Sequence, residues 1–240
     1  MFYRVVLSFV AALFIVFGNT AAAFASNDNG QKRAAIEVPL NIAILIQDDL
    51  ISQVGNEMDL TRDFIRSLPS GSRVMVGYIR SGSLQVRQPF TTDLERAARS
   101  LRIPVSSAAA APFNPYVEVV DALRKFDSSW KGTNAVLLIS DGLDTSRGFD
   151  VTSAANTIDL HRAIKNANDR NVAIFTFYAP SVGLTSRSRL AASYGQSSLN
   201  RLANETGGKA FFQGSTGFVS FDSHFRRLRE AINSQYARAS

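Results

Sequence analysis

Short, continuous apolar runs recur along the chain and predict buried β-strands. The strongest runs are residues 40–46 (LNIAILI), 135–139 (AVLLI) and 172–178 (VAIFTFY). Runs of this kind, in which polar residues do not alternate with apolar ones, are typical of strands buried on both faces of a parallel sheet. Weaker runs predict three further strands, at residues 73–79, 84–90 and 210–212. The turn at 81–83 (SGS) predicts that the first two of these weaker strands form a hairpin.

Segments with apolar residues at helical spacing separate these strands. They predict helices at residues 58–68, 93–101, 116–126, 158–169, 199–206 and 218–236. The stretch at 104–115, rich in alanine, serine and proline, and the polar stretch at 185–198 are predicted to be loops. Gly207-Gly208 predicts the end of the helix before it. Strands that alternate with helices indicate an α/β fold that is doubly wound. We therefore expect a mostly parallel sheet with one antiparallel edge strand and helices on both faces.

The N-terminus has the pattern of a secretory signal peptide. Arg4 precedes an apolar run from Val5 to Phe17, and Ala23-Phe24-Ala25 has the small-x-small pattern of a cleavage site. An uncleaved anchor is the alternative, but this run is shorter than the about 20 residues that span a membrane. We predict a signal peptide at residues 1–25, a flexible leader at 26–37 and one domain at 38–240. The protein is then periplasmic or secreted, and no later run is long enough to span a membrane.

Composition narrows the classes of function. Hydrophobic residues make up 45% of the 240 residues and charged residues 19%, which fits one globular α/β domain. The net charge is +6, but lysine and arginine are scattered instead of clustered with aromatic residues, so we expect no nucleic-acid binding. The chain has no cysteine, which excludes disulfides, thiolate metal sites and cysteine nucleophiles. It also lacks a Gly-x-Ser-x-Gly elbow and a glycine-rich phosphate loop.

Three carboxylates follow predicted strands. Asp48 and Asp49 come after the first strand, and Asp141 comes after the strand at 135–139. Because ligands of open α/β sheets bind at the carboxyl ends of the strands, these side chains are candidates for holding a divalent cation. The alternative is that Asp48 and Asp49 cap the following helix and that Asp141 is a turn residue. The residues alone leave both interpretations open.

Three motifs together resemble the von Willebrand factor type A family. They are residues 43–50 (AILIQDDL), 136–145 (VLLISDGLDT) and 202–212 (LANETGGKAFF), and the resemblance covers Val38 to Tyr236. The chain looks most similar to the bacterial exported branch described as VWFA-related. The resemblance implies a Rossmann-like sheet of about six strands, binding of a protein partner through loops, and a metal-ion-dependent adhesion site.

The family's metal site pairs an Asp-x-Ser-x-Ser turn with a threonine and an aspartate from two other loops. Carried over, Asp48 takes the first position of the turn and Ser52 the last, whereas Leu50 stands at the middle serine and cannot ligate. Asp141 matches the aspartate of the third loop. Asn114 is a poor substitute for the threonine of the second loop. The site implied by the resemblance is therefore degenerate.

A second alignment of the turn places Gln47 first and Asp49 at the middle serine, which loses the leading carboxylate. In either alignment the site lacks ligands that Mg²⁺ needs for its octahedral oxygen shell. We expect weak or absent binding of Mg²⁺, Mn²⁺ or Ca²⁺, and no other cofactor.

These observations favour an exported, adhesion-type module that binds a protein partner and is not an enzyme. Six residues in the loops beyond the strands are candidates for contacting the partner: Asp49, Gln53, Asn114, Tyr116, Asp144 and Arg147. The alternative is a metal-dependent hydrolase or phosphotransferase that uses Asp48, Asp49 and Asp141. That alternative lacks an obvious general base beside the carboxylates. A purely structural component of the cell envelope is a third possibility.

Overall fold

The computed structural model describes residues 36, 38–130, 132–148, 157–213 and 219–239. The predicted signal peptide lies outside the described residues. So does the predicted leader at 26–37, except for Ile36.

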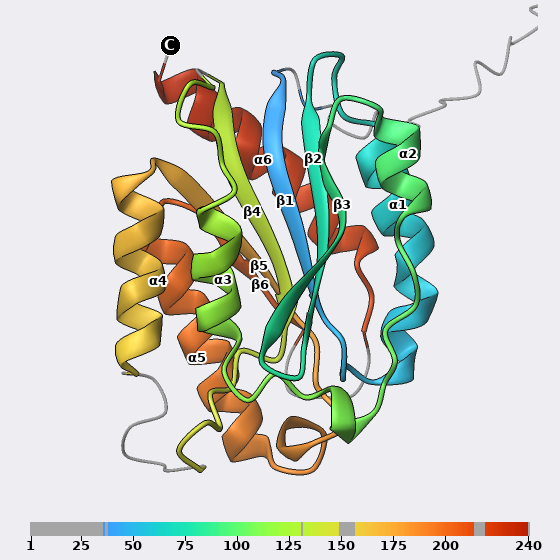
Figure 1. The fold of residues 1–240 in the computed structure, drawn as a ribbon, viewed down its shortest axis with the longest axis vertical. Helices are drawn as coiled ribbons and strands as arrows, with labels where there is room; N and C mark the ends of the chain where they lie inside the picture. Colours follow the sequence, from blue (N-terminus) through green and yellow to red (C-terminus); the bar gives the residue numbers. More distant parts are fainter. Residues whose placement is uncertain (1–35, 37, 131, 149–156, 214–218, 240) are drawn as a thin grey trace, which may run out of the picture. The chain divides into compact units, whose positions relative to one another are not determined.

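Six strands form one sheet, in the order β3-β2-β1-β4-β5-β6 (Figure 1). The strands are β1 (Leu40–Gln47), β2 (Arg73–Arg80), β3 (Ser83–Thr91), β4 (Thr133–Ser140), β5 (Val172–Tyr178) and β6 (Ala210–Phe211). All neighbouring pairs are parallel except β2 and β3, which form an antiparallel hairpin at one edge. The architecture confirms the doubly wound α/β sheet with one antiparallel edge strand that the apolar pattern predicts.

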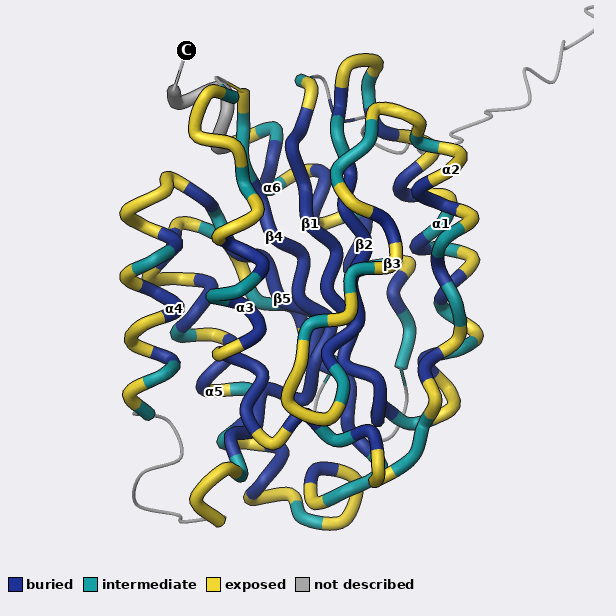
Figure 2. The backbone as a smooth tube through the Cα atoms, viewed as in Figure 1, coloured by how far each residue is buried: buried dark blue, intermediate teal, exposed yellow. Residues whose placement is uncertain are grey.

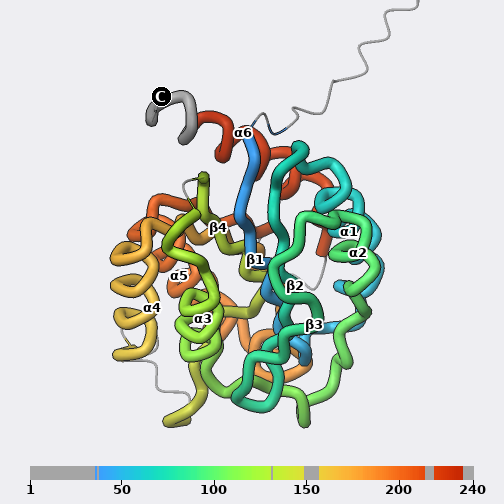
Figure 3. The backbone as a smooth tube through the Cα atoms, turned by 45° about the horizontal axis from the view of Figure 1, so that its top comes forward, coloured from blue at the N-terminus to red at the C-terminus, as the bar shows by residue number. Residues whose placement is uncertain are grey.

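Helices cover both faces of the sheet (Figures 1 and 3). One face carries α1 (Met58–Arg66), α2 (Leu94–Arg99) and α6 (Asp222–Ala239), and the other carries α3 (Pro115–Leu123), α4 (Ile158–Asp169) and α5 (Arg189–Glu205). Three short 3-10 helices lie in the connections: η1 (Ser52–Glu57), η2 (Ala108–Ala110) and η3 (Leu184–Ser186). Within the described part of the chain, none of the helices has the length and apolarity needed to span a bilayer.

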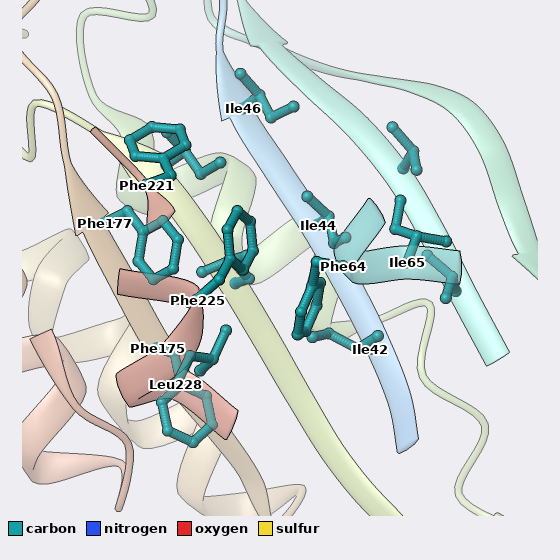
Figure 4. Close-up of a cluster of buried hydrophobic side chains, with 14 of the residues drawn as sticks. Ile42, Ile44, Ile46, Phe64, Ile65, Phe175, Phe177, Phe221, Phe225 and Leu228 are labelled. Atoms are coloured by element: carbon teal, nitrogen blue, oxygen red, sulfur yellow. The ribbon is translucent and has the colours of Figure 1, made fainter. Parts of the chain in front are cut away.

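The central strands β1, β2, β4 and β5 are buried between two apolar layers and are mostly dark blue in Figure 2, whereas the edge strand β3 is largely exposed. On the α1, α2 and α6 face, Phe64 stacks on Phe225 at 4.8 Å between ring centres, and Phe177 packs edge-on against Phe225 at 5.0 Å (Figure 4). Such aromatic pairs add about 0.5–1.5 kcal/mol to the burial of their area.

Side chains along β1 alternate between these two layers. Ile42, Ile44 and Ile46 point into the layer with α1, α2 and α6, whereas Ala43 and Leu45 point into the layer with α3, α4 and α5. Because the period of a strand is two residues, the alternation decides which polar residues at the end of β1 share a face.

The prediction of a loop at 185–198 is wrong, because helix α5 begins at Arg189. The side chain of Ser188 accepts a hydrogen bond from the backbone N–H of Ala191 and caps the helix. The buried face of this first half carries small residues, which do not produce an apolar helical pattern. At Gly195 an added Cβ would lie 1.9 Å from the backbone oxygen of Asp141. Close approach of α5 to β4, and not a large apolar side chain, holds this part of the helix in place.

The helix end predicted at Gly207-Gly208 is confirmed. Gly207 has a φ of +77°, and the N–H of Gly208 donates to the carbonyl of Ala203 at 2.8 Å. This is the bond pattern of a Schellman C-cap.

Candidate functional site

The carboxyl ends of β1, β4 and β5 meet at one edge of the sheet, at the lower end of Figure 1. Three loops surround this edge, at residues 102–114, 141–148 and 179–188. In open α/β sheets this is the edge where ligands bind.

Five polar side chains form a buried group at the ends of β1 and β4, which we call the edge cluster: Gln47, Asp49, Ser140, Asp141 and Thr185. The amide oxygen of Gln47 accepts hydrogen bonds from Ser140 Oγ at 2.5 Å and from the backbone N–H of Asp141 at 3.2 Å. Its amide nitrogen donates to Asp49 Oδ1 at 2.8 Å, and Thr185 Oγ1 donates to Asp141 Oδ2 at 3.0 Å. A neutral amide therefore links the two central strands.

The two carboxylates of the edge cluster are only 3% and 4% exposed, for Asp49 and Asp141 respectively. Burial and the neighbouring charge of Asp141 raise the pKa of Asp49 to about 6. Burial also raises the pKa of Asp141, although hydrogen bonds from donors such as the Leu143 N–H oppose this effect. Both carboxylates are bound by N–H and O–H donors, and their closeness raises the energy of holding two negative charges here.

Asp48 lies on the opposite face of the strand from the edge cluster. Its two oxygens accept hydrogen bonds from Arg102 Nη1 at 2.6 Å and Nη2 at 2.8 Å, and Arg80 Nη1 is 3.5 Å away. The guanidinium of Arg102 lies 4.0 Å from the ring centre of Tyr78, and the backbone N–H of Val105 donates to Asp48 Oδ1 at 3.0 Å. Asp48 therefore anchors the beginning of the 102–114 loop.

The structure places the three predicted metal ligands in different surroundings. Asp48 binds Arg102, and Asp141 belongs to the edge cluster. Ser52 is exposed at the start of η1, where its Oγ is 3.4 Å from Gln53 Oε1. The side chains that do converge with Asp141 are Gln47 and Asp49, the pair of the second alignment.

These residues do not fit a resident divalent cation. Among the described residues, there is no group of three or more histidine, aspartate or glutamate side chains that could hold a metal ion. At the edge, the neutral amide of Gln47 stands where a charged ligand would strengthen metal binding, and Asp49 Oδ1 and both oxygens of Asp141 already accept hydrogen bonds. Mg²⁺ instead requires a nearly complete octahedral shell of oxygen ligands.

Two of the predicted contact residues are buried and support the loops. Asn114 accepts a hydrogen bond from the N–H of Tyr116, which caps α3, and its amide donates to Asp159 at 2.8 Å. Tyr116 is fully buried, and its hydroxyl donates to the carbonyl of Gly142 at 2.6 Å. Burial raises the pKa of the Tyr116 phenol, so it remains protonated. Asn114 and Tyr116 therefore support the loops of this edge through buried hydrogen bonds and are not exposed to a partner.

The other predicted contact residues divide between interior and surface. Asp144 is buried, and its Oδ1 accepts hydrogen bonds from the N–H and the hydroxyl of Ser146. Asp49 is buried in the edge cluster, whereas Gln53 and Arg147 are exposed. Within the predicted set, Gln53 and Arg147 are therefore the side chains that a partner can reach directly.

Exposed apolar side chains gather in the loops of this edge and in the first turn of α5, a grouping that the sequence pattern does not predict. Of the eight large apolar side chains exposed in the described residues, five lie here, and we call them the apolar rim: Ile103, Val105, Phe113, Leu184 and Leu190. Three of them are at least half exposed: Ile103 at 60%, Phe113 at 58% and Leu190 at 50%. Single apolar residues in loops are common, so their grouping is visible only in the fold.

The ends of the central strand hold two of the rim's loops. The backbone carbonyl of Asp48 accepts a hydrogen bond from the N–H of Ser106 at 3.0 Å. The carbonyl of Asp49 accepts one from the N–H of Val182 at 2.9 Å. Adjacent residues at the end of β1 thus each hold one of these loops by a backbone hydrogen bond.

The fold is shared with solved structures of two bacterial proteins. One is an aerotolerance-related membrane protein from Bacteroides fragilis NCTC 9343, with a TM-score of 0.55 and 14% identity over 82% of this chain and 99% of that one. The other is the conserved hypothetical protein BatB from Bacteroides thetaiotaomicron, with a TM-score of 0.54 and 16% identity over 84% of this chain and 99% of that one. No protein-family model and no curated protein sequence matches the chain. At these identities the comparisons show a common fold, a doubly wound α/β domain whose strand ends are framed by loops.

Proposed function

We propose that this chain is an exported module like the von Willebrand factor type A domain, which binds a protein partner through the loops at the carboxyl edge of its sheet and catalyses no reaction. The observation that carries this proposal is the apolar rim, because apolar side chains that gather on one exposed surface mark interaction sites. The two Bacteroides proteins have a similar fold, which supports the α/β architecture that the proposal assumes for this chain.

A hydrolase that uses the three carboxylates is the second candidate, and the geometry disfavours it. Asp49 and Asp141 are too deeply buried to contact a substrate, and Asp48 is bound to Arg102. The chain has two histidines, and neither is a base for this site. His161 is exposed on α4 beside Arg201, and His224 is buried near Phe177, where burial lowers its pKa to about 4.

Export rests on the N-terminal sequence pattern, with cleavage after Ala25. The test is N-terminal sequencing of the protein recovered from the periplasm or medium of a host that expresses the full chain. A mature protein that begins at Ser26 supports the proposal, and a protein that retains Met1 or remains in the cytoplasm contradicts it.

Capture of a partner tests the binding function. The exported chain is used to capture proteins from an envelope fraction, in parallel with a variant carrying Phe113→Ser, Leu184→Ser and Leu190→Ser. We expect a defined partner that the wild type retains and the variant loses. The control is Phe212→Ser, which removes an exposed phenylalanine just after the lateral edge strand β6 and outside the apolar rim. Equal capture by the wild type and the rim variant would contradict the proposed function.

A further inference from the structure

We propose that the partner presents an acidic segment with interspersed apolar side chains, and that arginine side chains at the edge supply the positive charge that binds it without a metal ion. This inference rests on the proposed function and names the chemistry of the partner. It is carried by how charges are distributed between the surface and the interior of this edge.

Within the described residues 102–114, 141–148 and 179–190, the exposed charged side chains are arginines. Arg147 lies in the loop after β4, and Arg187 and Arg189 flank Ser188 at the start of α5, all three exposed to solvent. The acids within residues 102–114, 141–148 and 179–190 are Asp141 and Asp144, and both are buried. The outward face of these loops therefore carries positive charge.

Asp48 at the end of β1 and the two acids within these loops, Asp141 and Asp144, are turned inward and have internal partners. Asp48 binds Arg102, Asp141 accepts a hydrogen bond from Thr185, and Asp144 accepts two from Ser146. These contacts leave the exposed arginines as the charges that an approaching molecule meets first. A surface with one sign of charge attracts segments of the opposite sign and rejects those of the same sign.

Each exposed arginine has an apolar side chain of the rim close to it along the chain or across a hydrogen bond. Arg187 and Arg189 lie between Leu184 and Leu190 in the sequence. Phe113 is joined to the loop of Arg147, because its carbonyl accepts a hydrogen bond from the N–H of Thr145 at 2.6 Å. A partner that satisfies this surface needs carboxylates and apolar side chains within one segment.

The same surface fits polyanions without apolar groups less well. A nucleic acid would occupy the arginines through its phosphates and would leave the leucines and phenylalanine exposed to water. Apolar contacts surrounded by arginine are instead typical of protein interfaces, in which arginine and aromatic residues are enriched. The observations thus favour a peptide segment.

The test uses a labelled short peptide of alternating glutamate and leucine, measured by fluorescence polarisation. A lysine–leucine peptide and a glutamate–serine peptide serve as comparison probes. We expect the glutamate–leucine peptide to bind most tightly, with affinity that falls between about 0.05 and about 0.5 M salt and does not change with EDTA. Equal binding of the lysine–leucine peptide, or loss of binding in EDTA, would overturn the inference.

Matched variants separate the edge from the overall charge. Arg147→Gln, Arg187→Gln and Arg189→Gln together are expected to weaken peptide binding about tenfold, as three exposed ion pairs would. The control removes the same charge elsewhere, through Arg124→Gln, Arg162→Gln and Arg170→Gln on and after α3 and α4, and is expected to change binding less than about twofold. An equal loss in both triple variants would overturn the inference.

Two further outcomes keep this inference distinct from the proposed function. If the arginine variant still captures the partner and the apolar-rim variant does not, the module binds protein but the partner is not selected by charge. If vesicles containing phosphatidylglycerol bind the wild type and the glutamate–leucine peptide does not, the surface recognises an anionic membrane, and the acidic-peptide inference is wrong.

Discussion

Arg102 binds the carboxylate of Asp48 with both terminal nitrogens, across 54 positions of the sequence. The Asp48 side chain is fully buried, whereas that of Arg102 is 28% exposed and lies over Tyr78. The pair connects the end of the central strand to the loop that carries Ile103 and Val105. The resemblance to the von Willebrand factor type A family assigns the Asp48 carboxylate to a metal ion, but in this structure the carboxylate binds Arg102. The contribution of this ion pair to folding can be measured directly.

We expect Asp48→Asn to lower the free energy of unfolding by about 2 kcal/mol, because it removes charge-assisted hydrogen bonds to a buried carboxylate. The measurement is urea denaturation, with the midpoint expected to fall and the slope to stay constant. Asp59→Asn is the matched control, because the Asp59 side chain is 86% exposed and pairs with Arg62 on the surface of α1. Its expected effect is under about 0.5 kcal/mol, so similar losses in both variants would contradict a structural role for the Asp48–Arg102 pair.

Asp49 gives a dependence of stability on pH. Its pKa is raised from 3.8 to about 6 in the folded protein, so the folded state binds the extra proton more tightly than the unfolded state does. The ionised carboxylate therefore destabilises the fold; this cost is absent below pH 3.8, grows as the pH rises to about 6, and is complete above that pH.

We accordingly expect Asp49→Asn to be more stable than the wild type at pH 7.5 by about 2 kcal/mol, with an advantage that disappears near pH 4. The amide oxygen of the new residue can still accept the hydrogen bond from Gln47. Unfolding free energies of both proteins across this pH range check the prediction. A difference that is the same at every pH would show that the carboxylate does not titrate as the burial implies.

Gly195 allows α5 to approach β4. Alanine normally stabilises a helix relative to glycine by about 1 kcal/mol, but here its Cβ would collide with the backbone of Asp141. We expect Gly195→Ala to destabilise the protein by at least about 2 kcal/mol, measured by thermal or urea unfolding. The control is Ser197→Ala, which changes an exposed position of the same helix and is expected to alter stability by less than about 0.5 kcal/mol. Stabilisation by Gly195→Ala would show that the helix can move away from the strand.

The edge cluster predicts that divalent cations do not stabilise the protein. Calorimetric titration with Mg²⁺, Mn²⁺ and Ca²⁺ is expected to give no binding heat, and the melting temperature is expected to stay constant. Asp141→Asn is measured in parallel. A stabilisation by any of the three ions that is lost in this variant would contradict the metal-free interpretation of the edge.

The fold was accessible from the sequence because the buried strands and most helices have strong apolar periodicity. The segments predicted at 158–169 and 172–178 are found as α4 and β5 with the same bounds. The first half of α5 was missed because Ala191, Ala192 and Gly195 pack through close approach and carry little apolar signal.

The candidate site is harder to predict from the sequence than the fold, because most of its contacts join residues that are far apart in the chain. The alternation of Ala43, Leu45 and Gln47 could have shown that Gln47 and Asp49 share a face while Asp48 points away. The partner of Asp48 could not be found in this way, because Arg102 lies far along the chain and only the folded backbone brings it close. The grouping of the apolar rim has the same origin, since its members come from the 102–114 loop, the 179–188 loop and the first turn of α5.

The carbonyls of Asp48 and Asp49 tie two of the binding loops to β1, a strand in which all eight residues are buried. Moving either loop would require breaking its bond to a fully buried strand. In the proposed complex, a partner would then meet a surface whose shape exists before binding, and little conformational entropy would be lost when the complex forms. A preorganised surface of this kind would bind a ligand of matching shape tightly and would bind weakly to one that requires the loops to move.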